Sequence, residues 1–185
     1  MYIRNEASKI CVENLRHNGF MKRLLLPLLA ALALPSAVNA LYSFKEDLMT
    51  DEKIHSAYHY STTKTSNSIG VQEEAYIVVR CKLKAGLKTE LDAYLGTPTY
   101  NADNVRIGLR WDGGTPKSET WLESKNNQQF FAPNDISFIN KLASSDTLVF
   151  QWEPYRSSTR AVKFELTEFH KDLKKLSDFG CFVIE

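Results

Sequence analysis

Residues 75–82 read Ala-Tyr-Ile-Val-Val-Arg-Cys-Lys, and this stretch decides the fold class. It places three β-branched residues and a tyrosine within eight positions, a composition and length typical of a β-strand. Ala85-Gly86 follows as a turn signal. We therefore expect a strand here that turns tightly into the next one.

Other strands are expected on both sides of this segment. Val105, Ile107, Leu109 and Trp111 alternate with polar or small residues, as in a half-buried strand, and Asp112-Gly113-Gly114 then signals a hairpin. The remaining segments with strand character are residues 54–62, 89–95, 118–123, 148–152 and 161–166. Because short turns join consecutive strands, the strands must run antiparallel.

Two short helices are expected in the C-terminal half. Asn134 suits the N-cap of the first. In the second, Phe169, Leu173 and Leu176 share one face, and Gly180 ends the helix. The sequence thus predicts a mainly β fold of the β-rich α+β class. Its core would be an antiparallel sheet or sandwich of six to seven short strands, with the two short helices in the C-terminal half.

The N-terminal region resembles a targeting signal. Residues 21–40 contain a short basic start, an apolar run and small residues at the end, which predicts a signal peptide cleaved after Ala40. Residues 1–20 then represent an extension from a start codon placed too early, or a long basic region removed with the signal. An uncleaved anchor is a further alternative. Cleavage would make the protein periplasmic or secreted.

The mature chain would have two parts. Residues 41–73 form a polar N-terminal segment with a first strand; within it, 41–52 are expected to be a tether or short helix, and 62–70 a loop. Residues 74–185 form the β-rich domain. Without residues 1–40, 18 basic and 20 acidic side chains remain, a balance that argues against nucleic-acid binding. No later stretch is apolar enough to span a membrane.

Two cysteines, Cys81 and Cys181, remain after signal removal. In an oxidising compartment such a pair is usually joined, which would close residues 74–185 covalently. Two buried free thiols or a catalytic cysteine are the alternatives, although neither cysteine has a histidine beside it in sequence.

A basic strand face is the main candidate binding site. Arg106 and Arg110 lie on one side of their strand, and Lys117 is expected across the hairpin. Together they could bind a carboxylate or phosphate. The alternative is an ordinary solvent-exposed face paired with Glu119 or Glu123. Trp111 should be buried on the opposite, apolar face.

Enzymatic chemistry has little support in the sequence. His55 and His59, four residues apart, share a face of a strand or helix and are the best candidates for a small hydrolase or metal-dependent enzyme. A metal site needs three or four ligands, and no third is evident. There is no Gly-x-Ser-x-Gly motif. We therefore expect no catalytic residues, no metal and no cofactor.

The order of landmarks resembles the TagO/VasI family of exported proteins associated with type VI secretion. The matching residues are Val79-Arg80-Cys81, Arg110-Trp111-Asp112, Trp121, Ser124, Phe131-Ala132-Pro133, Phe138, Leu142, Leu148, Pro154-Tyr155, residues 161–166 and Cys181. The resemblance covers about residues 74–181. It implies the β-rich fold, the Cys81–Cys181 bridge and accessory work at a secretion apparatus. Related stand-alone exported proteins of unknown role are an equal match.

These features lead to one functional expectation. The chain should be an exported, non-enzymatic accessory or binding protein of the bacterial periplasm or envelope. Its partner would be an envelope protein or a cell-wall component. A structural envelope protein is the remaining alternative.

Overall fold

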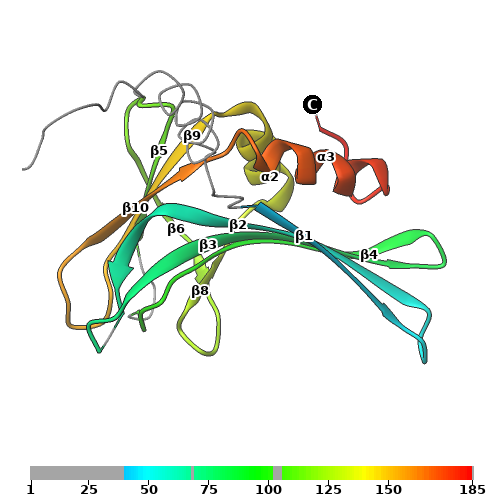
Figure 1. Ribbon diagram of the computed structural model, residues 1–185, viewed down its shortest axis with the longest axis horizontal. Coiled ribbons are helices and arrows are strands. Elements are labelled where there is room, and N and C mark those ends of the chain that lie inside the picture. The colour runs from blue at the N-terminus through cyan, green and yellow to red at the C-terminus, as the bar shows by residue number, and fades with distance from the viewer. Residues whose placement is uncertain (1–39, 68, 102–105, 185) are drawn as a thin grey trace, which may run out of the picture. The chain divides into compact units, whose positions relative to one another are not determined.

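The computed structural model describes residues 40–67, 69–101 and 106–184. These residues form ten strands in two antiparallel sheets, with two helices in the C-terminal half (Figure 1). The predicted fold class is therefore confirmed. Neither helix is long and apolar enough to cross a membrane.

The larger sheet has the strand order β1-β2-β3-β4-β8-β7. Its strands are β1 (Ala40–Asp47), β2 (Glu52–Ser66), β3 (Gln72–Lys84), β4 (Leu87–Gly96), β8 (Gln129–Phe131) and β7 (Leu122–Glu123). β3 contains the segment 75–82, and it lies between β2 and β4 because tight turns join it to each. Ala85 and Gly86 form the second of these turns with positive φ angles of 51° and 78°.

The smaller sheet has the order β10-β9-β5-β6. Its strands are β5 (Arg106–Trp111), β6 (Lys117–Thr120), β9 (Thr147–Trp152) and β10 (Arg160–Glu165). The predicted strand over 118–123 is split, because β6 belongs to this sheet and β7 to the larger one. Trp121 lies between them and is buried, so the chain changes sheet where this indole enters the core.

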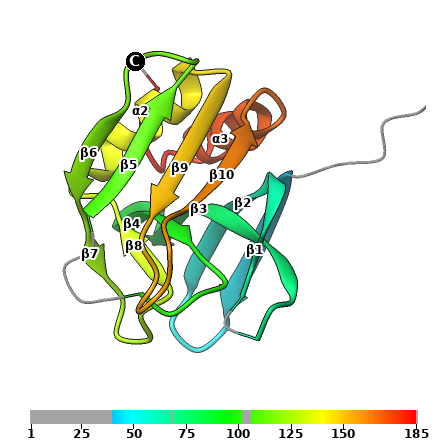
Figure 2. The same cartoon turned by 90° about the vertical axis from the view of Figure 1, so that its left-hand side faces the viewer.

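The core fills the space between the two sheets and beneath the helices. Its fully buried large side chains are Trp152, Phe130, Phe150, Phe164, Phe169, Ile77, Leu95, Ile107, Ile139, Leu142, Leu148 and Leu166. Figure 2 shows the smaller sheet from one side, with α2 (Asp135–Ser144) and α3 (Phe169–Asp178) at one end of it. Asn134 caps α2 as predicted, accepting a hydrogen bond from the Ser137 backbone N–H.

Two predictions about the N-terminal part were wrong. Residues 41–52 were expected to be a tether or helix, but most of them form β1, which pairs with β2 from Ala40↔His59 to Asp47↔Glu52. The sequence hides this strand because β1 is the edge of its sheet, where polar side chains are favoured on an exposed surface.

The loop expected from residue 62 begins later, because β2 continues through a bulge between Tyr60 and Lys64. At this bulge, the Thr62 hydroxyl donates to the Lys163 carbonyl at 3.1 Å, and the Lys163 N–H donates to Thr63 Oγ1 at 2.9 Å. The hydroxyl-rich segment therefore joins β2 to β10 across the two sheets. A bulge of this kind is a structured device for bending a strand.

Candidate functional site

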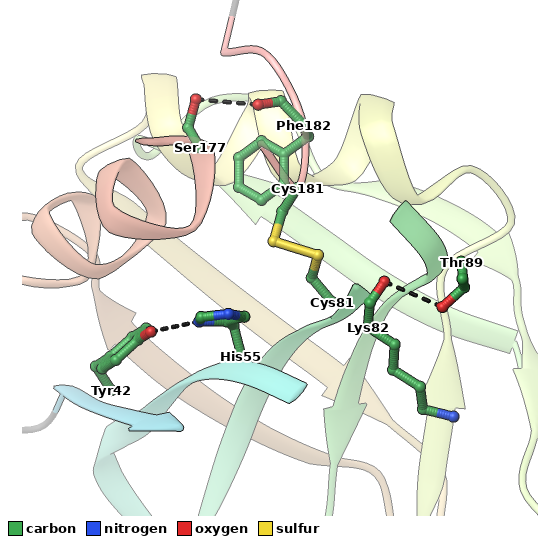
Figure 3. The surroundings of a disulfide bond; sticks show 8 residues. All are labelled: Tyr42, His55, Cys81, Lys82, Thr89, Ser177, Cys181 and Phe182. Carbon is green, nitrogen blue, oxygen red and sulfur yellow. Dashed lines mark hydrogen bonds between the residues drawn. A yellow bond between two sulfur atoms is a disulfide. The ribbon is translucent and has the colours of Figure 1, made fainter. Parts of the chain in front are cut away.

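A disulfide joins Cys81 on β3 to Cys181, which follows α3. The two Cα atoms are 5.8 Å apart, and both side chains are fully buried. The pairing predicted from the sequence is therefore confirmed, and the alternative of two buried free thiols is wrong. The bond attaches the end of α3 to the centre of the larger sheet (Figure 3).

The end of α3 is shaped by Gly180, whose φ of 81° reverses the chain. The Gly180 N–H donates to the Ser177 carbonyl at 2.9 Å, and the Cys181 N–H donates to the Leu176 carbonyl at 3.1 Å. Ser177 Oγ then donates to the Phe182 carbonyl at 3.0 Å, as Figure 3 shows. These bonds turn the chain back over the sheet and fix the residue before Gly180, Phe179, in place.

Phe179 closes a cavity of about 770 Å³ between the end of α3 and the larger sheet. We call this cavity the aromatic cup. Its lining residues are Tyr42, Phe44, Glu46, Asp51, Lys53, His55, Leu83, Ala85, Gly86 and Phe179. They come from β1, β2, the β3–β4 hairpin and the end of α3, so only the tertiary fold brings them together.

The aromatic rings of the cup pack closely on one another. The His55 ring stacks on Phe179 with centroids 4.4 Å apart and lies 5.0 Å from the Phe44 ring. Tyr42 also stacks on Phe179, at 6.1 Å. Phe44 and Phe179 each expose half of their surface, although both are large apolar side chains. An exposed apolar concavity of this kind is typical of a binding site.

His55 gives the cup its polar centre. Its side chain is buried, and its Nδ1 lies 2.6 Å from the Tyr42 hydroxyl, as Figure 3 shows. Burial lowers the pKa of His55 from its ordinary value of 6.5, and the nearby Lys53 charge lowers it further. Burial raises the pKa of Tyr42. Both groups are therefore neutral at pH 7, and they share one hydrogen bond between the Tyr42 hydroxyl and His55 Nδ1.

We expect His55 to make the protein less stable in mild acid. Because its folded-state pKa lies below 6.5, the unfolded chain binds more protons as the pH falls. The stability contributed by neutral His55 is fully present above the unfolded pKa and is lost as pH falls through the lowered folded pKa. Thermal unfolding at a series of pH values between about 8 and 5 measures this effect.

The matched variant for this test is His55→Gln, which keeps a polar side chain that does not titrate. Its melting temperature should fall less than that of the wild type over the same pH range. Charged groups around the cup include Lys53, Glu46 and Asp51 in its lining and the Lys175–Asp172 pair on α3 near Tyr42, and all are unchanged in the variant. Equal pH slopes for both proteins would contradict the prediction.

The second histidine of the predicted pair has different surroundings. His59 lies on the same face of β2 as His55, as predicted, but its ring stacks on Phe169 with centroids 5.0 Å apart and lies 6.1 Å from Phe164. The two imidazoles thus enter different aromatic surroundings. In the part of the chain that the structure describes, no three His, Cys, Asp or Glu side chains lie close enough together to hold a metal ion.

The structure does not bring Arg106, Arg110 and Lys117 together. Residues paired directly across two antiparallel strands share a face, and Lys117 pairs with Leu109, whereas Arg106 pairs with Thr120. Lys117 therefore lies on the face of Leu109, opposite to the two arginines. Arg110 is also occupied, because its guanidinium donates to the Gly113 and Gly114 carbonyls at 2.8 and 2.9 Å.

Trp111 was expected to be buried, and the structure shows it only half-buried. It lies on the apolar face of β5, as its alternation with Ile107 and Leu109 requires. However, Trp111 is the last residue of β5, and the neighbouring elements cover its side chain only in part. Its indole lines a second cavity, between the β5–β6 hairpin and α2.

Sequence reasoning missed the aromatic cup. Tyr42, His55 and Phe179 are far apart in the chain, and none stands in a recognisable motif. The one available signal was the position of Phe179 beside Gly180 and Cys181. A residue next to a helix stop and a disulfide is held in a fixed place, even when its side chain is exposed.

Comparisons with known proteins identify no family. No family model and no curated protein matches the sequence. Among solved structures, the chain is similar to the crystal structure of invasion associated protein b from Bartonella henselae, at 12% identity and a TM-score of 0.49. The match covers 78% of this chain and 96% of that chain. A likeness at this level carries no argument about function.

Proposed function

We propose that the protein is an exported, non-enzymatic accessory protein that binds an apolar segment of another envelope protein in the aromatic cup. The observation that carries this proposal is the cavity itself, with half-exposed Phe44 and Phe179 at its mouth. Exposing two phenylalanines to water is unfavourable, and a partner that covers them would recover the free energy of burying them.

The surface around the cup favours a protein partner over a small ligand. The β1–β2 and β3–β4 hairpins end side by side beyond α3 (Figure 1), since Glu52 pairs with Lys84 at that end of the sheet. Leu48 and Met49 in the first turn are 85% and 92% exposed, and Leu87 beside the second turn is 73% exposed. Apolar surface thus continues past the cavity, as in protein interaction sites.

Charged side chains at the rim fit the same kind of partner. Glu46 and Lys53 form an exposed ion pair at 3.8 Å, and Asp51 lies in the adjoining turn. Such a pair contributes little to stability. An apolar centre with a charged, solvent-exposed rim is the usual composition of a protein interface.

Export is part of this proposal, and the disulfide supports it. Cleavage after Ala40 would remove one residue of β1 and leave Leu41–Asp47 paired with β2. The disulfide is of the kind that persists in oxidising compartments. The resemblance of residues 74–181 to the TagO/VasI family agrees with accessory work at a secretion apparatus.

Selection of peptides from a random library on the purified protein tests the proposed function. The selected peptides should share aromatic or aliphatic anchor residues. Replacing both Phe44 and Phe179 with Ser should weaken their binding by at least about tenfold, because anchors in an apolar pocket dominate such interfaces. Fluorescence anisotropy of labelled peptides measures the affinity.

The matched control replaces Leu122 and Tyr155 with Ser. These side chains are 74% and 56% exposed and do not line the cup. This variant should bind the selected peptides as the wild type does. If the Phe44/Phe179 variant binds them equally well, or if the peptides carry no apolar anchor, the cup is not the binding site.

A further inference from the structure

We infer that the second cavity is an independent binding site for an acidic sugar. This cavity, which we call the tryptophan cleft, has a volume of about 530 Å³ and shares no residue with the aromatic cup. Its lining residues are Leu109, Trp111, Lys117, Glu119, Trp121, Pro133, Asn134, Ser137, Phe138, Asn140, Lys141 and Ser144. The inference does not depend on the proposed function of the cup.

The floor of the cleft is apolar and closely packed. Leu109, Trp121 and Phe138 are buried there, and the Trp121 and Phe138 rings meet edge to face with centroids 4.9 Å apart. Trp111 stands above them, with its centroid 5.8 Å from that of Phe138. The Trp111 indole is thus packed against Phe138, remains half-buried and lines the cleft, with the Lys141 ammonium over its ring.

The walls of the cleft are polar. Lys117 and Glu119 come from β6, and Asn140 and Lys141 from α2. Such a combination of a flat aromatic surface with several polar side chains suits a sugar ring, whose C–H face packs on an indole while its hydroxyls form hydrogen bonds. An apolar peptide would leave these polar groups without partners.

The polar side chains of the cleft differ in their hydrogen bonds within the protein. The side-chain oxygen of Asn140 is buried and accepts no hydrogen bond from any described residue. Buried acceptors of this kind are normally satisfied by water or a ligand. Glu119, by contrast, already accepts a hydrogen bond from the Trp121 indole N–H at 2.9 Å.

The charge of the cleft favours an acidic sugar, because two lysines and a single carboxylate, that of Glu119, line it. Lys117 and Lys141 are exposed, and among the described residues neither forms an ion pair. The Lys141 ammonium lies 5.9 Å from the Trp111 ring centroid. A ring that packs on Trp111 therefore brings its substituents within reach of this ammonium, and a carboxylate would be the favoured substituent. Lys117 adds a second positive charge from the opposite wall.

Titration with three trisaccharides of similar size tests this inference: one of hexuronic acid, one containing a sugar with a lactyl carboxylate, and one neutral. Tryptophan fluorescence and calorimetry would follow binding. Either or both acidic sugars should bind, and lose affinity as salt is added, because the charges are exposed. The two acidic probes distinguish a uronic acid polymer from a cell-wall glycan as the source. Binding of the neutral sugar as tightly as both acidic ones, or no binding of any, would overturn the inference.

Two variants locate the site. Lys117→Gln/Lys141→Gln should weaken acidic-sugar binding by about tenfold, which corresponds to about 1.4 kcal/mol, and should flatten its salt dependence. Both lysines are exposed, so this variant should fold normally. Trp111→Ala should abolish the fluorescence response. The charge-matched control Lys84→Gln/Lys125→Gln should bind as the wild type does; equal losses in both double variants would show a general charge effect and contradict the assignment.

Discussion

Replacing both Cys81 and Cys181 with Ala should lower the free energy of unfolding by about 2–5 kcal/mol. The bridge closes a segment with a sequence separation of 100 residues, and the chain-entropy model gives about 4.7 kcal/mol for a loop of that length. Both side chains are fully buried, so losing their packing adds to the effect. Urea denaturation of the oxidised wild type and the double variant, with linear extrapolation, measures the difference.

Reduction of the wild-type protein serves as the control for this prediction. It breaks the bond and keeps both sulfur atoms in the core, so it separates the cross-link from the packing of the side chains. The reduced protein should lose most of the stability that the double variant loses. A loss below about 1 kcal/mol in both would show that α3 stays on the sheet without the bond.

The same variant should also affect the aromatic cup. Phe179 lies two residues before Cys181, and His55 pairs directly with Cys81 across β2 and β3. The disulfide therefore connects the two walls of the cup. When it is absent, Phe179 has more conformations available, and peptides that bind the cup must order it at an added entropic cost.

The second large effect is expected at Trp152. Its side chain is 1% exposed and stacks on Phe150 with centroids 5.0 Å apart. Its indole N–H donates to Thr99 Oγ1 at 3.0 Å. Trp152→Ala would open a large cavity and leave a buried hydroxyl without its donor, so stability should fall by about 3–5 kcal/mol or more. Urea denaturation followed by circular dichroism measures the loss.

Trp111→Ala is the control for Trp152→Ala. Both residues are strand tryptophans, but Trp111 is only half-buried and its main ring contact is Phe138 at 5.8 Å. Its truncation should cost about 1–2 kcal/mol, within the common range for partly covered sites. Equal losses in the two variants would mean that the tryptophan cleft is closed in solution and that Trp111 belongs to the core.

Much of the β-rich domain could be predicted from local pattern. β3 was recognised because apolar β-branched residues in a short run have few other stable environments. The buried face of α3, formed by Phe169, Leu173 and Leu176, followed from helical periodicity in the same way. The hairpin after β5 could be predicted from Gly113 and Gly114, which signal a tight turn. In each of these elements, the deciding interaction is between residues close together in the chain.

The predictions that failed depended on pairing between distant residues or on register. Lys117 was placed beside Arg106 and Arg110, but a change of register by one residue moves a side chain to the other face of a sheet. The turn after Trp111 sets that register, and it pairs Lys117 with Leu109. β1 was missed because a polar edge strand is recognisable only from its partner, β2.

The sequence by itself determined the fold class, the antiparallel strands, the buried face of α3 and the pair of cysteines that could join. These follow from residue composition and short-range periodicity. The tertiary structure alone decided where binding surfaces form. The aromatic cup needs Tyr42, His55 and Phe179 from three elements, and the tryptophan cleft exists because α2 covers Trp121 fully and Trp111 only in part. The exposure of a side chain depends on what packs above it, and no local pattern encodes that.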